Sequence, residues 1–256
     1  MKLDVKYLTD PIIANEIVTI NGIKCEKGSI VLVGGYTGSG KTHFLMKMLK
    51  KSKGRKLFFS LELSESTLFY RYVYKHFSPD DLKEYSDRIG FVFGKGMKLE
   101  DLIKMMKLYD NKGDKQLDMI FIDSPETIRD TSERDAIYKP DWWHEEKMFK
   151  QIDSVCEDTG IILVTTRQIR GEGKEYPSSA YFKGSSIAKE RADVIVILKD
   201  DRRFKLEKSR VGQSLPEWID WTDSNLLDDE YLKENDKDEK KPYYVDDDIS
   251  DDNEMF

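Results

Sequence analysis

Short apolar runs alternate with amphipathic stretches along most of the chain. The apolar runs are typical of strands that are buried on both faces, and they lie at residues 30–33, 56–61, 117–123, 161–166 and 193–198. Helix-like patterns stand between them, at residues 43–49, 64–73, 80–89, 99–108 and 144–156. Strands that alternate with helices in this way predict a mainly parallel, twisted sheet with helices on its faces.

The end of the pattern differs from its beginning. Strand-like runs at residues 193–198, 203–208 and 218–221 follow one another without a long helix between them, which predicts antiparallel edge strands. We therefore divide the chain into an irregular lead-in (1–28), an α/β core (29–222) and an acidic tail (223–256). The tail combines high charge with few branched apolar residues, so we expect it to be disordered.

Composition favours one intracellular domain. The chain has 256 residues, 39% of them hydrophobic, which is enough for one substantial core. We find no apolar run long enough to span a membrane and no signal-peptide core, so we expect a soluble, cytoplasmic protein. Its two cysteines, Cys25 and Cys156, are far apart in the sequence and predict neither a disulfide framework nor a zinc site.

Charge is unevenly distributed. The net charge is −7, but the tail alone holds 14 acidic and 4 basic side chains, or −10. The remainder has 38 Lys and Arg against 35 Asp and Glu, a balance of +3. A mildly basic body does not exclude a DNA or RNA partner.

The sequence Gly35-x4-Gly40-Lys41-Thr42 follows the first buried run and opens a helix pattern. Strand, glycine loop and helix in this order form a P-loop, in which backbone N–H groups hold phosphate oxygens. Lys41 is expected to reach the β- and γ-phosphates of ATP, and Thr42 to hold Mg²⁺. The full expected nucleotide set is Gly35, Gly38, Ser39, Gly40, Lys41, Thr42 and His43. A glycine-rich turn without function is the alternative.

Two carboxylates end neighbouring strand patterns. Asp123 closes the run at 117–123, where it could order Mg²⁺ beside Thr42. Glu62 closes the run at 56–61, where it could polarise the attacking water. Glu62 could equally cap the helix that begins near Ser64.

Further motifs follow the P-loop along the chain. They are Phe-Ser-Leu-Glu-Leu-Ser-x3-Leu-x2-Arg at 59–71, Ile-Phe-Ile-Asp at 120–123, Arg167-Gln168, the segment 183–193 and Lys208-Ser209-Arg210. In this order the motifs resemble the motor domain of DnaB-family replicative helicases, which are RecA-like ATPases, over roughly residues 15–215. The family usually carries an additional N-terminal domain, and only about 28 residues precede the first core strand here.

The resemblance implies roles for individual residues. Glu62 matches the water-activating glutamate, Asp123 the Walker B aspartate, and Gln168 the glutamine that senses the γ-phosphate. Lys208 and Arg210 match the pair that reaches a neighbouring subunit's nucleotide, which implies a homo-oligomer, expected to be a hexamer. Alternatively, Gln168 is a polar strand end, and Lys208 and Arg210 are exposed edge charges.

We expect single-stranded DNA to contact polar loops that face the ring's pore. Arg170, Lys174 and Lys183 mix with Tyr176 and Tyr181 in the segment 170–186, which we expect to be mobile. Solvated loop charge is the alternative. A second polar loop, at 124–140, holds Arg129, Arg134 and Lys139.

The tail ends in acidic residues before Phe256. It resembles tails by which single-stranded-DNA-binding and phage replication proteins recruit partners, which implies a polymerase, primase or other replisome protein. A solubilising tail is the alternative.

Taken together, the sequence favours an ATP- and Mg²⁺-dependent hexameric DNA helicase of phage type that acts in the cytoplasm of a bacterial host. A filament-forming recombinase or annealing ATPase and a nucleotide-gated loader remain open.

Overall fold

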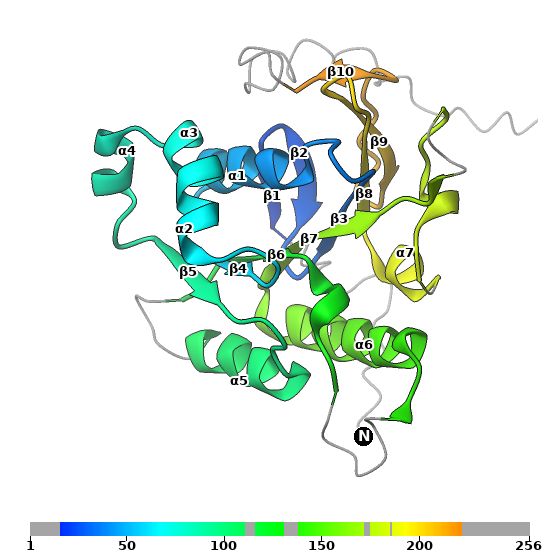
Figure 1. Cartoon of the computed structure of the whole chain (residues 1–256), viewed down its shortest axis with the longest axis horizontal. Helices are drawn as coiled ribbons and strands as arrows, with labels where there is room; N and C mark the ends of the chain where they lie inside the picture. Colours follow the sequence, from blue (N-terminus) through cyan, green and yellow to red (C-terminus); the bar gives the residue numbers. More distant parts are fainter. Residues whose placement is uncertain (1–15, 111–115, 131–137, 172–174, 185, 222–256) are drawn as a thin grey trace, which may run out of the picture.

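An eight-stranded mixed sheet forms the centre of the protein in the computed structural model, which describes residues 16–110, 116–130, 138–171, 175–184 and 186–221 (Figure 1). The strand order is β10-β9-β8-β3-β7-β6-β4-β5. Its strands are β3 (Ile30–Gly35), β4 (Lys56–Ser60), β5 (Ile89–Phe93), β6 (Met119–Asp123), β7 (Ile162–Gln168), β8 (Val194–Leu198), β9 (Arg203–Ser209) and β10 (Ile219–Asp220). The pairs among β5, β4, β6, β7, β3 and β8 are parallel, whereas β9 and β10 are antiparallel. The predicted fold class is confirmed.

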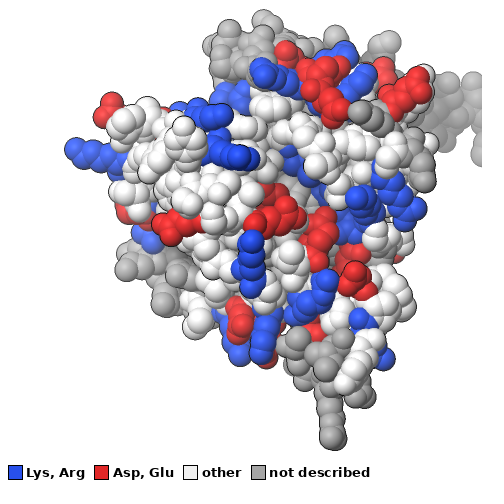
Figure 2. All heavy atoms as spheres, viewed as in Figure 1, with Lys and Arg blue, Asp and Glu red and all other residues white. Residues whose placement is uncertain are grey.

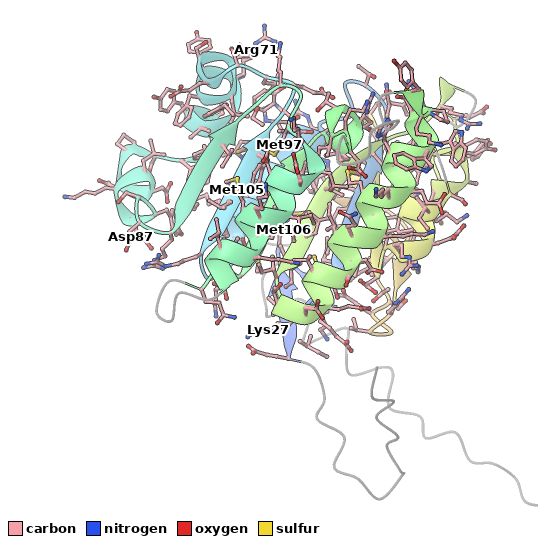
Figure 3. All side chains as sticks on the ribbon, turned by 90° about the horizontal axis from the view of Figure 1, so that it is seen from below. Lys27, Arg71, Asp87, Met97, Met105 and Met106 are labelled. Carbon is pink, nitrogen blue, oxygen red and sulfur yellow. The ribbon has the colours of Figure 1, made fainter. Side chains whose placement is uncertain are left out.

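Helices cover both faces of this sheet (Figure 1). One hydrophobic core joins it to α1 (Lys41–Lys51) and to the segment α2 (Glu65–Leu68), η1 (Phe69–Val73) and α3 (Tyr74–His76), which α4 (Pro79–Glu84) follows. A second core joins the other face to α5 (Leu99–Asp110), α6 (Asp141–Thr159) and α7 (Ile187–Arg191). Figure 3 shows α5 and α6 side by side, with Met105 and Met106 on α5. Among the described residues, no helix has the length and apolar character needed to cross a bilayer.

The lead-in is more regular than the sequence predicts. Its described part forms an antiparallel hairpin, β1 (Ile17–Ile20) and β2 (Ile23–Glu26). Asn21 and Gly22 join the strands, both with positive φ, at 49° and 81°. An Asn-Gly pair favours this two-residue turn because both positions need the left-handed region. The prediction of an irregular lead-in is therefore wrong for residues 17–26.

Helix boundaries also differ from the prediction. The helix expected at 80–89 is α4, which begins after a capping box between Ser78 and Asp81 and ends at Glu84. Ile89 instead starts β5 and pairs with Lys56. Pairing in the sheet outweighs the helical pattern at residue 89 because it gives hydrogen-bond partners to the backbone of this half-buried edge strand.

Lys56 connects the sheet to the end of α1. The side chain is 2% exposed, and its ammonium donates to the Leu49 and Ser52 carbonyls, at 3.0 and 2.5 Å. These carbonyls lie at the C-terminal end of α1, where a helix leaves acceptors unpaired and favours positive charge. Lys56 thus ties α1 to the strand that follows it.

We expect Lys56 to make stability depend on pH in the alkaline range. Burial lowers the pKa of Lys56 from 10.5 to about 8. Between these values the unfolded chain binds more protons than the folded chain, so the free energy of unfolding rises with pH, by up to about 3 kcal/mol. In urea unfolding at several pH values, the wild type and Lys53→Met, which alters an exposed lysine, should gain stability with pH relative to Lys56→Met. Burial also raises the pKa of the Cys25 and Cys156 thiols from 9.0, which lowers stability at higher pH in all three proteins alike, so the difference between the profiles is the quantity to measure. Parallel pH profiles for Lys56→Met and the wild type would refute the assignment.

Candidate nucleotide site

The loop between β3 and α1 has the geometry of a phosphate cradle. Gly38 and Gly40 have φ of 91° and 89°, in the left-handed region that favours glycine. The Ser39 hydroxyl donates to the Tyr36 carbonyl at 2.9 Å and closes the loop. The N-terminal turn of α1 follows directly, so its unpaired N–H groups face the loop.

Close packing explains why glycine occupies positions 35 and 40 of this loop. A Cβ on Gly35 would overlap the Ser39 hydroxyl, and one on Gly40 would lie 3.0 Å from the ring of Trp221. Trp221 also stacks edge-on against Phe44 of α1, and its carbonyl accepts from Lys47. The sequence indicates only a strand near Trp221 and does not show that the chain returns to the phosphate loop there.

Lys41 lies within the loop it is expected to serve. Its ammonium donates to the carbonyls of Gly35 and Tyr36, at 2.9 and 2.7 Å. Burial lowers the pKa of Lys41, and the carboxylates of Asp123, Glu126 and Glu62 oppose this shift. Because the Lys41 ammonium already lies in the phosphate loop, a change of side-chain rotamer is enough to bring it to phosphate oxygens bound there.

Thr42 and Asp123, the two residues expected to hold Mg²⁺, are in direct contact. The Thr42 hydroxyl donates to Asp123 Oδ2 at 2.6 Å, and Thr166 of β7 donates to Oδ1 at 3.1 Å. Burial raises the pKa of the Asp123 carboxyl, and the two threonine hydrogen bonds lower it. Thr166, which the sequence shows only as a strand residue, therefore fixes the orientation of this carboxylate.

Glu62 lies next to this pair. Ser60, at the end of β4, is in register with Asp123, so Glu62 emerges at the same edge of the sheet. Its side chain is exposed and accepts a hydrogen bond from the Ser124 hydroxyl. The helix cap is Ser64, whose hydroxyl accepts from the Thr67 N–H at 3.4 Å. The helix-capping alternative for Glu62 is therefore not what the structure shows.

Gln168 ends β7, the strand beside β3, and its side-chain amide donates to the Thr37 hydroxyl in the phosphate loop.

The His43 side chain points away from the phosphate loop. The His43 Nδ1 atom lies 3.0 Å from His76 Nε2, and the centroid of the His43 ring lies 4.6 Å from that of the Tyr72 ring. The His43 side chain is thus turned toward the helical segment after β4, and only its backbone N–H belongs to the first turn of α1.

The expected DNA-contacting residues emerge directly beyond β7. The Arg170 N–H donates to the Tyr181 carbonyl and the Lys183 N–H to the Gln168 carbonyl, both at 2.8 Å. Phe182, between Tyr181 and Lys183 in the sequence, is buried against Gly34. The described part of segment 170–186 is thus paired with the end of β7 rather than irregular. Lys174 and Arg134 lie outside the described residues, as does the tail 223–256.

Lys208 and Arg210 are not in the site. Ser209 pairs with Val194, which pairs with Val31 near the start of β3, so both cations lie at the end of the sheet opposite the phosphate loop. Arg210 pairs with Asp193 at 3.0 Å and is 59% exposed. The Lys208 ammonium lies 3.2 Å from the Lys189 carbonyl. Basic and acidic side chains are mixed over the face that Figure 2 shows.

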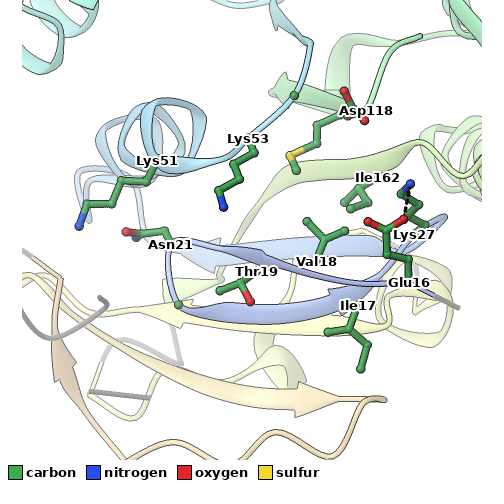
Figure 4. Close-up of a pocket in the computed structure, with 13 residues that line it drawn as sticks. Glu16, Ile17, Val18, Thr19, Asn21, Lys27, Lys51, Lys53, Asp118 and Ile162 are labelled. Carbon is green, nitrogen blue, oxygen red and sulfur yellow. Dashed lines mark ion pairs between the residues drawn. The ribbon is translucent and has the colours of Figure 1, made fainter. Parts of the chain in front are cut away.

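A hollow of about 660 Å³ also lies far from the phosphate loop. The β1–β2 hairpin, the end of α1 and the starts of β6 and β7 enclose it (Figure 4). The ion pair of Glu16 and Lys27, at 2.6 Å, stands at its rim. The groups that resemble a nucleotide site are instead at the carboxyl ends of β3, β4, β6 and β7.

The chain is similar to known proteins in its structure rather than in its sequence. No family model matches the chain, and no curated protein matches its sequence. The ATPase domain of G40P is a similar solved structure, with a TM-score of 0.60, 13% identity, and coverage of 76% of this chain and 81% of that one. A DnaB-like replicative helicase, described with its interactions with primase, has a TM-score of 0.59 and 14% identity. That match covers 73% of this chain, which spans 54% of the helicase. The chain therefore has the RecA-like fold of DnaB-like helicase ATPase domains.

Proposed function

We propose that the chain hydrolyses ATP and uses the energy to move along single-stranded DNA and unwind duplex during replication. The observation that carries this proposal is the convergence of Lys41, Thr42, Asp123, Glu62 and Gln168 at one edge of the sheet. In particular, the 2.6 Å hydrogen bond joins the Thr42 hydroxyl to the carboxylate that would order Mg²⁺.

The residues fit MgATP. The glycine loop has no room for side chains at Gly35 and Gly40, which allows backbone N–H groups to approach phosphates. Thr42 and Asp123 supply a hydroxyl and a carboxylate, the oxygen ligands that Mg²⁺ prefers. Bound Mg²⁺ would neutralise charge on the phosphates. Among the described residues there is no cluster of three or more His, Cys, Asp or Glu side chains suited to a metal.

Each protein group then has a separate task. Lys41 leaves the Gly35 and Tyr36 carbonyls to bind phosphate oxygens. The exposed Glu62 carboxylate, held by Ser124, orients and accepts a proton from the attacking water. Gln168 senses the γ-phosphate, a role that its hydrogen bond to Thr37 in the phosphate loop supports.

Assembly and partners belong to this proposal as well. Arg210 lies too far from its own phosphate loop to act there, which supports a role in a neighbouring subunit's site within a hexameric ring. Arg170 and Lys183 are both exposed beyond β7, where they suit a DNA backbone, and Lys174 completes the set from the sequence. The acidic tail ending in Phe256 would recruit a polymerase, primase or other replisome protein.

A strand-displacement assay on a forked duplex tests the helicase function. We expect unwinding that requires MgATP and six-fold rings in electron micrographs of the protein with single-stranded DNA and a non-hydrolysable ATP analogue. Helical filaments without strand displacement would favour the recombinase instead. ATP hydrolysis that is weak and unaffected by DNA would favour the nucleotide-gated loader.

A further inference from the structure

Arg167 precedes Gln168 on β7 and is only 2% exposed. Successive side chains on a strand point to opposite faces. Gln168 reaches Thr37 of the phosphate loop, whereas the Arg167 guanidinium pairs with Glu145 of α6. One strand end therefore carries both a residue of the nucleotide site and a buried ion pair with a helix outside it.

The segment that carries Lys183 rests on this ion pair. Gly184 has φ of 87°, and a Cβ there would overlap both the Arg167 guanidinium and the Glu145 carboxylate. On its other side, the Lys183 N–H donates to the Gln168 carbonyl at 2.8 Å. Any displacement of the Lys183 backbone must therefore disturb the backbone of Gln168, the packing over Arg167, or both.

A second carboxylate, that of Glu126, lines the same small cavity as Arg167. A space of about 190 Å³ is lined by Arg167, Glu126, Glu145, Lys183 and Gly184, among others. Burial lowers the pKa of the Arg167 guanidinium, and the Glu126 carboxylate opposes this. The buried Arg167 Nε has no hydrogen-bond partner among the described residues. The guanidinium thus has both room and a second acceptor, and Glu126 lies just beyond Asp123 in the sequence.

We propose that the Arg167–Glu145 ion pair is a positioning device that couples single-stranded DNA at Lys183 to ATP hydrolysis at the phosphate loop. The proposal rests on the proposed function. DNA that draws Lys183 outward lifts Gly184 from the pair, and the Arg167 guanidinium then turns toward Glu126. Because Gln168 shares the strand and bonds to Lys183, its side chain is repositioned at the same time.

Glu145→Gln tests this coupling, with Glu146→Gln as the matched control. Glu146 is the next residue on α6, and it pairs at the surface with Lys150 at 2.5 Å. We would measure ATP turnover of the full chain with and without saturating oligo-dT, together with oligo-dT affinity and the melting temperature. The expected result for Glu145→Gln is a stimulation ratio close to one, with basal turnover raised toward the DNA-stimulated rate of the wild type, because the freed Arg167 guanidinium can turn to Glu126 without DNA. Glu146→Gln should match the wild type in basal turnover and in DNA stimulation.

Gly184→Ala provides a second, independent variant. Its Cβ would displace the ion pair, whereas Gly171→Ala, in the same segment, meets open space. We expect Gly184→Ala to reduce DNA stimulation and Gly171→Ala to leave it unchanged. If either test variant fails to fold, the other decides the question.

The outcomes separate this inference from the function beneath it. A stimulation ratio that stays at the wild-type value in folded Glu145→Gln, even with a lower melting temperature, makes the pair merely structural and overturns the inference alone. Wild-type turnover that DNA does not stimulate overturns the inference and the DNA-driven motor, but leaves the ATPase. A wild type without ATP turnover overturns both proposals.

Discussion

Lys41→Ala should reduce ATP turnover by about 10³-fold, because it removes the cation that the phosphate loop itself supplies to stabilise charge on the transferred phosphoryl group. The Lys41 ammonium lies within the loop, bonded to two of its carbonyls, at 2.9 and 2.7 Å. The substitution removes that charge without opening the core, since the side chain is partly exposed. Steady-state phosphate release at saturating MgATP measures the effect.

The control for this experiment is Lys53→Ala. Lys53 is exposed beyond the end of α1, away from the phosphate loop, so its loss should leave turnover unchanged. Circular dichroism melting of both variants would show that the fold is kept. Normal turnover in Lys41→Ala would remove the phosphate loop from the reaction and the nucleotide site with it.

Arg210→Ala should bind ATP normally yet lose about 10³-fold or more in turnover, as expected for an arginine that completes a neighbour's site. The fold should tolerate the change because the ion pair with Asp193 is 59% exposed on the arginine side, and such pairs contribute little stability. Fluorescent nucleotide binding and phosphate release separate the two effects. Arg191→Ala is the matched control, since Arg191 also pairs with an aspartate, at 2.7 Å.

Mixing two inactive proteins distinguishes action between subunits from action within one. Lys41→Ala subunits keep Arg210, and Arg210→Ala subunits keep Lys41. An equimolar mixture should therefore regain part of the wild-type turnover, at interfaces that combine the two intact residues. Turnover that stays at the level of the separate variants would show that Arg210 does not act across an interface. Wild-type turnover in Arg210→Ala alone would show that Arg210 is not needed at all.

Local motifs made part of the site predictable. Lys41 and Thr42 lie within a single short motif, and Asp123 ends a strong strand pattern, so the sequence indicates all three. Their meeting also follows from the fold, since the carboxyl ends of parallel strands share one edge of a sheet. The class of the sheet was equally predictable, because buried parallel strands leave continuous apolar runs.

Contacts between distant segments were not predictable. Thr166 appears in the sequence as a buried strand residue, and only the alignment of β6 with β7 brings it to Asp123. Trp221 reaches Gly40 through the antiparallel edge strands, whose order no local pattern reveals. Arg167 and Glu145 lie on separate elements, so their pairing needed the packing of α6 against the sheet. The β1–β2 hairpin has strands too short for a clear alternating pattern.

The decisive measurement is ATP turnover of the purified full chain in Mg²⁺, with and without single-stranded oligo-dT. We expect hydrolysis that requires Mg²⁺ and that oligo-dT accelerates severalfold. Duplex DNA without a single-stranded arm should give less acceleration. Absence of hydrolysis in both conditions, by protein that is folded and binds ATP, would contradict the claim that this site drives a DNA motor.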